Sequence, residues 1–131
     1  MSDYPFKKSE EAWKESLSGE AYRVLRQKGT EHPHTGKYNM HFDEGTYVCS
    51  GCHTPLFEST AKFDSGCGWP SFSEAIQGTV RYEADSSHGM MRTEILCAHC
   101  GGHLGHVFDD GPTSTQRRYC VNSVSLGFKE S

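Results

Sequence analysis

Six cysteines, four of them in two CxxC pairs, constrain the fold of this chain more than any other feature of its sequence. The pairs are Cys49-Ser50-Gly51-Cys52 and Cys97-Ala98-His99-Cys100. One CxxC turn presents two thiolates to an ion, and two turns complete a closed tetrahedral site of the structural type. Because the pairs lie far apart in the sequence, we expect the ion to join two distant β-turns instead of closing one small finger.

Zinc is the ion that we expect, although four sulfurs also hold iron. Two thioredoxin-like redox pairs, or ordinary buried thiols, are the alternative interpretations. A metal would compensate for a thin core, since only 34% of the 131 residues are hydrophobic. Zinc binding in small domains amounts to about 10–16 kcal/mol.

Charge and hydropathy exclude several classes of partner. Thirteen Lys and Arg against 17 Asp and Glu give a net charge of −4, and no basic region surrounds either cysteine pair, so a nucleic-acid partner is not expected. No apolar run reaches the roughly 18 residues of a membrane span, and the acidic start does not match a signal peptide. We expect a cytoplasmic monomer, in which six cysteines point to metal or redox chemistry rather than disulfides.

The length is that of one domain. We expect a flexible lead-in over residues 1–8 and a single domain over 9–131. Ser9 is a good N-cap for a first helix, and a second fits Gly19–Lys28, with Gly29 positioned to end it. Both helices are short and amphipathic, so they should pack on the outside of a larger body.

The rest of the chain has the period-2 alternation of strands and no βαβ rhythm. These features predict a mainly β fold with antiparallel sheets. The expected strands are Tyr47–Cys49, Thr79–Asp85, Met90–Leu96 and Arg118–Phe128.

The other two cysteines have different surroundings. Cys67 lies between two glycines and close to Pro70, which is typical of an exposed, mobile loop. Cys120 alternates with Arg118 and Asn122, so the three share one face of a strand. A guanidinium beside a thiol favours the thiolate. The alternative is that Cys120 is a small residue of the core.

Two histidines, His103 and His106, lie three residues apart in a glycine-rich segment that begins at the second cysteine pair. We interpret this segment as a loop held in place by the metal turn. Imidazole can donate and accept protons near neutrality, and an enzyme that uses a reactive cysteine needs such a group beside the thiol. The remaining histidines are expected to be solvent-exposed: His32, His34, His41, His53, His88 and His99.

Three motifs resemble the signatures of the B-type methionine sulfoxide reductases: Gly66–Phe72 (GCGWPSF), His103–Pro112 (HLGHVFDDGP) and Arg118–Ser123 (RYCVNS). The two CxxC pairs resemble those of the zinc-containing members. The resemblance extends from about Tyr22 to Phe128. It implies two antiparallel sheets forming a β-barrel-like core, with the helices packed outside. It also implies one structural Zn²⁺, bound by Cys49, Cys52, Cys97 and Cys100.

The same resemblance implies reduction of methionine R-sulfoxide, free or in oxidised proteins, as a repair of oxidative damage. Cys120 would attack the sulfoxide sulfur and become a sulfenic acid. Cys67 would then resolve it to a Cys67–Cys120 disulfide, which thioredoxin reduces.

Further roles follow from matching positions in the family. His103 and His106 would polarise or protonate the sulfoxide oxygen, helped by a water near Asn122. Arg118 would assist thiolate formation, and Trp69 would form an apolar wall for the substrate methyl group. Two other classes remain as alternatives: a thiol–disulfide oxidoreductase that uses a CxxC pair, and a zinc-dependent binding module without turnover.

Overall fold

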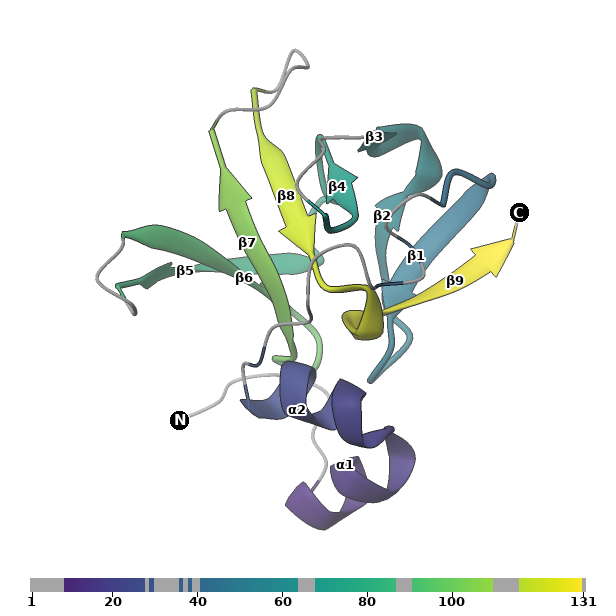
Figure 1. Ribbon diagram of the computed structural model, residues 1–131, viewed down its shortest axis with the longest axis vertical. Coiled ribbons are helices and arrows are strands. Elements are labelled where there is room, and N and C mark those ends of the chain that lie inside the picture. Colours follow the sequence, from purple (N-terminus) through teal and green to yellow (C-terminus); the bar gives the residue numbers. More distant parts are fainter. Residues whose placement is uncertain are drawn as a thin grey trace.

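The computed structural model describes residues 9–27, 29, 36, 38, 41–63, 68–86, 91–109 and 116–130. Within them, two short helices precede two antiparallel sheets (Figure 1). The three-stranded sheet has the order β2-β1-β9, and the six-stranded sheet has the order β3-β4-β8-β7-β6-β5. The elements are α1 (Glu10–Ser16), α2 (Gly19–Gln27), β1 (Gly45–Cys49), β2 (Pro55–Glu58), the 3-10 helix η1 (Ser59–Ala61), β3 (Lys62–Phe63), β4 (Ser71–Phe72), β5 (Val80–Asp85), β6 (Arg92–Cys97), β7 (His103–Phe108), β8 (Arg118–Val121), the 3-10 helix η3 (Ser123–Ser125) and β9 (Leu126–Glu130).

The mainly β class, the two antiparallel sheets and the two helices are confirmed. The expectation of one continuous strand over Arg118–Phe128 is wrong. The 3-10 helix η3 interrupts it, and the Ser125 N–H donates to the Asn122 carbonyl at 3.0 Å. Strand β8 therefore belongs to the large sheet and β9 to the small one. Tertiary hydrogen bonds hold this break, because Asn122 donates to the Leu104 carbonyl and Ser125 donates to the His103 carbonyl from their side chains.

The N-terminal helices pack against the body of the protein below both sheets, as Figure 1 shows. The Ser9 hydroxyl accepts a hydrogen bond from the Ala12 N–H at 3.2 Å, which confirms the expected N-cap. The Trp13 ring lies against Gly51, where an added Cβ would be only 3.0 Å from it, and α2 buries Leu25 against Gly102. The helices therefore cover both cysteine turns. The lead-in over residues 1–8 lies outside the described part of the chain.

Aromatic side chains fill the space between the sheets. Phe57 and Phe72 stack with ring centroids 4.3 Å apart, and the Tyr47 ring contacts Phe72 edge-on. Tyr119 and Val121 of β8 are buried on the same side. Burying one such side chain stabilises the fold by about 1.5–3 kcal/mol. This packing leaves the opposite face of β8 for polar side chains. Among the described helices, none is long and apolar enough to cross a bilayer.

Candidate active site and metal centre

Strand register places a row of polar side chains on one face of the large sheet. Asp85 of β5 lies opposite Arg92 of β6. Further along β6, Glu94 lies opposite His106 of β7. His106 in turn lies opposite Cys120 of β8. Directly opposed residues share a face of a sheet, so four neighbouring strands contribute to one constellation.

His103 reaches the same face through an irregularity in β7. Residues three apart in a regular strand point to opposite faces. The register between β6 and β7 shifts within this segment and leaves Leu104 as an extra residue, which is the arrangement of a β-bulge. The His103 and His106 rings therefore lie on the same side, with centroids 5.6 Å apart. The expectation that these histidines lie in a loop is wrong, because they belong to a strand.

Cys120 is half-buried and faces a cavity rather than the core, so the interpretation of Cys120 as a small core residue is wrong. A guanidinium N–H of Arg118 donates to its sulfur, with Nη1 2.8 Å from Sγ. The same guanidinium lies over the Phe108 ring, 4.6 Å from the centroid. A charged donor held in this way favours the thiolate.

The cavity beside Cys120 has a volume of about 290 Å³. Five of the residues named from the sequence line it: Trp69, His106, Arg118, Cys120 and Asn122. His103 is not among the lining residues, and its buried imidazole lies beside Glu94. Sequence reasoning missed the other lining residues, which are Arg92, Gly105, Phe108 and Val121.

Two backbone features bring the cavity walls together. Strand β4 pairs with β8 so that Ser71 lies opposite Cys120, and this pairing brings Trp69, two residues earlier, to the rim. Gly105 allows β7 to approach β8, because a Cβ there would overlap the Cys120 carbonyl. Cys67 lies outside the described residues.

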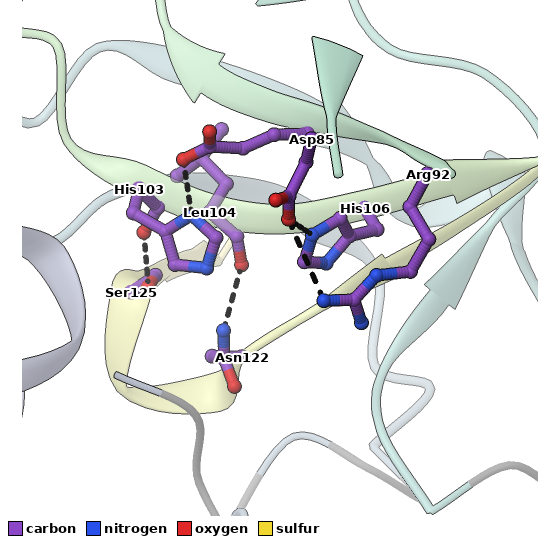
Figure 2. A network of polar contacts seen from close by, with 8 residues as sticks. Asp85, Arg92, His103, Leu104, His106, Asn122 and Ser125 are labelled. Carbon is purple, nitrogen blue, oxygen red and sulfur yellow. Dashed lines mark hydrogen bonds and ion pairs between the residues drawn. The ribbon is translucent and has the colours of Figure 1, made fainter. Parts of the chain in front are cut away.

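Each histidine is held by a carboxylate, as Figure 2 shows. His103 Nδ1 lies 2.7 Å from Glu94 Oε2, and both side chains are buried. His106 Nε2 lies 2.8 Å from Asp85 Oδ2, and Asp85 also pairs with Arg92 at 3.5 Å. A carboxylate accepts hydrogen bonds, so each pair fixes the protonated nitrogen of its imidazole. For His106 this leaves Nδ1 as the nitrogen able to take up a further proton.

The charge state of His106 depends on opposing effects. Burial lowers its pKa from the ordinary value of 6.5. The hydrogen bond to Asp85 acts in the opposite direction, whereas electrostatic repulsion from Arg92 and from the neighbouring His103 adds to the lowering. His106 is therefore mainly neutral at pH 7 and can accept a proton.

We expect the C2–H resonance of His106 to titrate with a midpoint below 6.5, because burial disfavours the imidazolium. In Asp85→Asn the midpoint should fall further, since the carboxylate that stabilises the charged ring is lost. Proton NMR from pH 4 to 8 measures both midpoints, with the urea-denatured chain as reference. Because the unfolded state then binds more protons, this group makes stability rise with pH below about 6.5. A midpoint above that of the denatured chain would contradict the assignment.

The charged side chains that surround the two histidines were not identified from the sequence. They are Asp85, Arg92 and Glu94. A signal existed, because hairpin pairing around the turn after Asp85 places Glu83 opposite Glu94. Two like charges directly opposed are unfavourable, so one of them needs another partner. That partner, His103, became visible only with the register of β7.

The expected exposure of the remaining histidines is partly wrong. His53 is exposed. His41 is partly buried, with Nδ1 2.8 Å from the Tyr47 hydroxyl, and His99 is also partly buried. His32, His34 and His88 lie outside the described residues.

The four cysteines of the two CxxC pairs form one cluster, and their sulfur atoms all lie within 4.8 Å of one another. Across the two turns, Sγ atoms are 3.6 Å apart both for Cys49 with Cys100 and for Cys52 with Cys97. Four zinc–sulfur bonds of about 2.3 Å in a tetrahedron place sulfurs about 3.8 Å apart. The cluster therefore fits a tetrahedral ion of this size, and zinc is compatible with it.

The surroundings of the cluster also suit thiolates. The Gly51 N–H points at the Cys49 sulfur, at 3.4 Å. Hydrogen bonds from Cys100 and Cys49 lower the pKa of Cys97 to about 7 and also lower the pKa of Cys52, whereas hydrogen bonds to the other thiols and burial raise the pKa of Cys49 and Cys100. Metal ligation requires deprotonated sulfur, so a bound cation would displace the protons held by Cys49 and Cys100.

Comparison with known proteins agrees with this geometry. The SelR domain family matches residues 17–130. Peptide methionine sulfoxide reductase MsrB of Variovorax paradoxus is 55% identical over 132 residues, which cover 96% of this chain and 97% of that protein. The chain belongs to the MsrB family. The MsrB protein of Leptospira interrogans is 56% identical over 129 residues (98% of each chain). That of Bradyrhizobium diazoefficiens is 60% identical over 120 residues, covering 91% of this chain and 86% of its own.

Membership confirms the resemblance inferred from the three motifs. The region that matches the family, 17–130, contains both cysteine turns and every residue that lines the cavity. The family assignment therefore applies to the whole site and not to one part of the chain.

Proposed function

We propose that this protein reduces methionine R-sulfoxide to methionine, in oxidised proteins or as the free amino acid. The observation that carries the proposal is the Cys120 sulfur, which accepts from Arg118 at 2.8 Å on the wall of a cavity also lined by His106. A thiolate next to a proton carrier is what a sulfoxide needs, because its oxygen must be protonated as its sulfur is attacked. Family membership supports the same substrate class.

In the first step, the Cys120 thiolate attacks the sulfoxide sulfur. The proton that the Cys120 thiol gave up to His106 Nδ1 before this attack then passes to the sulfoxide oxygen. The oxygen ends on Cys120 as a sulfenic acid, and methionine leaves with two more electrons than it brought. Arg118 stabilises the thiolate, Asn122 orients water near the oxygen, and the Trp69 indole packs on the substrate methyl group. His103, held by Glu94, supports the position of the His106 ring.

In the second step, the Cys67 thiol attacks the sulfenic acid, forming a Cys67–Cys120 disulfide and releasing water. Thioredoxin then reduces the disulfide by exchange and leaves with its own dithiol oxidised. The two cysteines must come within about 7 Å, measured between Cα atoms. Glycines on both sides of Cys67 allow the backbone freedom for this approach.

We also propose that the cysteine cluster holds one Zn²⁺ as a structural ion. Cys49, Cys52, Cys97 and Cys100 would be its ligands, and the bound ion would crosslink two distant turns. Because four protein sulfurs complete the coordination, no position is left for substrate. We further propose that residues 9–131 form a single domain and that the protein works as a cytoplasmic monomer.

The thiol–disulfide oxidoreductase alternative is less well supported. Such enzymes need an accessible, reactive CxxC pair. Here Cys49, Cys97 and Cys100 are buried, and the four sulfurs face one another.

The proposal is tested with racemic N-acetyl-methionine sulfoxide, dithiothreitol and chiral separation of the remaining epimers. We expect the R epimer alone to disappear. Loss of the S epimer alone would contradict the stereochemical part, and no turnover by zinc-loaded, reduced protein would support a binding module instead.

For Cys67→Ser we expect turnover with dithiothreitol to be nearly unchanged, because a small thiol reduces the sulfenic acid directly. Turnover with thioredoxin should fall by about 10²-fold or more, because the disulfide that it reduces cannot form. Steady-state rates with each reductant measure the difference. Equal rates with both reductants would remove Cys67 from the resolving role.

A further inference from the structure

The first cysteine turn is hydrogen-bonded directly to the 3-10 helix η3. Ser50, which lies between Cys49 and Cys52, makes two hydrogen bonds to this helix. Its N–H donates to the Ser125 carbonyl at 2.9 Å, and its hydroxyl donates to the Val124 carbonyl at 2.8 Å. One residue of the metal-binding turn therefore holds two consecutive peptide units of η3.

On its other side, η3 holds the catalytic face. The buried Ser125 hydroxyl donates to the His103 carbonyl at 2.9 Å. Asn122, the residue before η3, donates twice to the Leu104 carbonyl, from its backbone N–H at 2.9 Å and from Nδ2 at 3.1 Å. Figure 2 shows both contacts side by side beneath β7. The bulged start of β7 is therefore hydrogen-bonded to η3 and to the residue before it, through the consecutive carbonyls of His103 and Leu104.

The second cysteine turn is connected to His103 directly along the backbone. Only Gly101 and Gly102 separate Cys100 from His103. The Cys97 N–H donates to the Gly102 carbonyl at 2.9 Å, which fixes this short connection. His103 is therefore attached covalently to one turn and through Ser125 and Ser50 to the other. An ion that joins the two turns would fix both attachments relative to each other.

We infer that Ser50 and Ser125 are positioning residues, which transmit the geometry of the cysteine turns to His103 and Asn122. Neither serine lines the cavity, so both act through the residues they hold. Side chains of a reactive site that shift by about 1 Å can lose on the order of 10²-fold in rate. The consequence for turnover rests on the proposed function, whereas the consequence for backbone order does not.

Amide hydrogen exchange of the zinc-loaded protein tests the link without reference to activity. In Ser50→Ala and Ser125→Ala we expect the peptide that contains residues 122–126 to exchange about fivefold faster, with unchanged zinc content. Ser50→Thr keeps the hydroxyl and should restore the original exchange. Ser73→Ala is the matched control, because Ser73 donates from its hydroxyl to the Ala61 carbonyl at 3.4 Å away from this link.

Turnover of N-acetyl-methionine R-sulfoxide tests the catalytic consequence. We expect kcat to fall by about tenfold in Ser125→Ala with little change in KM, because the serine does not touch substrate. Ser50→Ala should show a smaller fall of the same kind. The double variant should lose less than the product of the two single losses, since both act on the same element.

Unchanged exchange at 122–126 in both alanine variants would overturn the inference, as would equal acceleration in Ser73→Ala. Independent, multiplicative losses in the double variant would also overturn it. Should the unmodified protein show no turnover, the proposed function fails, while faster exchange in the two variants would still support the positioning role.

Discussion

We expect Cys120→Ser to lower kcat/KM for methionine R-sulfoxide by at least about 10³-fold, even with dithiothreitol as reductant. A serine hydroxyl at this position is hardly ionised near neutrality, so the Arg118 guanidinium would have no thiolate to stabilise. Without a nucleophile no sulfenic acid forms, and neither Cys67 nor a small thiol can replace that step. The measurement is consumption of the R epimer by equal amounts of folded, zinc-loaded protein.

The same variant should keep its fold. The side chain is half-buried, faces the cavity and changes by one atom, so the melting temperature should stay within a few degrees of that of the unmodified protein. Mass spectrometry after exposure to the sulfoxide and dimedone adds a direct readout in Cys67→Ser, where the sulfenic acid is not resolved: Cys120 should be labelled there, and no label should appear when Cys120→Ser is added. Substantial turnover by Cys120→Ser would remove the nucleophile assignment.

The second large effect concerns stability. We expect Cys97→Ser to lose the bound metal and to melt more than about 10 °C below the unmodified protein. Structural zinc contributes about 10–16 kcal/mol in small domains, whereas a whole domain is stable by about 5–15 kcal/mol. The cluster also anchors Trp13 and Leu25 through the glycines of the two turns, so the helices should loosen with it. Metal analysis and circular dichroism measure both effects.

Cys120→Ser is the matched control, because it exchanges the same atoms outside the cluster. A strong chelator added to the unmodified protein should reproduce the lower melting temperature, and zinc should restore it. Retained stability in Cys97→Ser, or a protein without zinc or iron that melts normally, would contradict the structural metal site.

The chemistry of the candidate site could be predicted from the sequence because it depends on residue types at short spacings. The period of a strand placed Arg118, Cys120 and Asn122 on one face, and the structure brings all three to one cavity. Two CxxC turns indicated one four-sulfur site, and their sulfurs lie within 4.8 Å of one another. The N-cap at Ser9 and the mainly β class with antiparallel sheets followed from equally local patterns, whereas the resemblance to the family implied that there are two sheets.

The partners of the histidines were decided by tertiary structure. Asp85 and Glu94 reach their imidazoles only through the register of β5, β6 and β7, and His103 turns to that face only because β7 carries an extra residue. The alternating pattern of Arg118–Phe128 likewise concealed the break at η3, because Ser123 and Ser125 fit a strand and a 3-10 helix equally well by sequence.

The sequence by itself determined which groups we propose for the chemistry and which could hold the metal, since these properties belong to thiols, imidazoles and their immediate neighbours. Only the tertiary structure decided that His106 lines the cavity while His103 is buried beside Glu94, and that Ser50 connects the first cysteine turn to η3. The physical reason is that pairing between distant strands fixes contacts that no local spacing encodes.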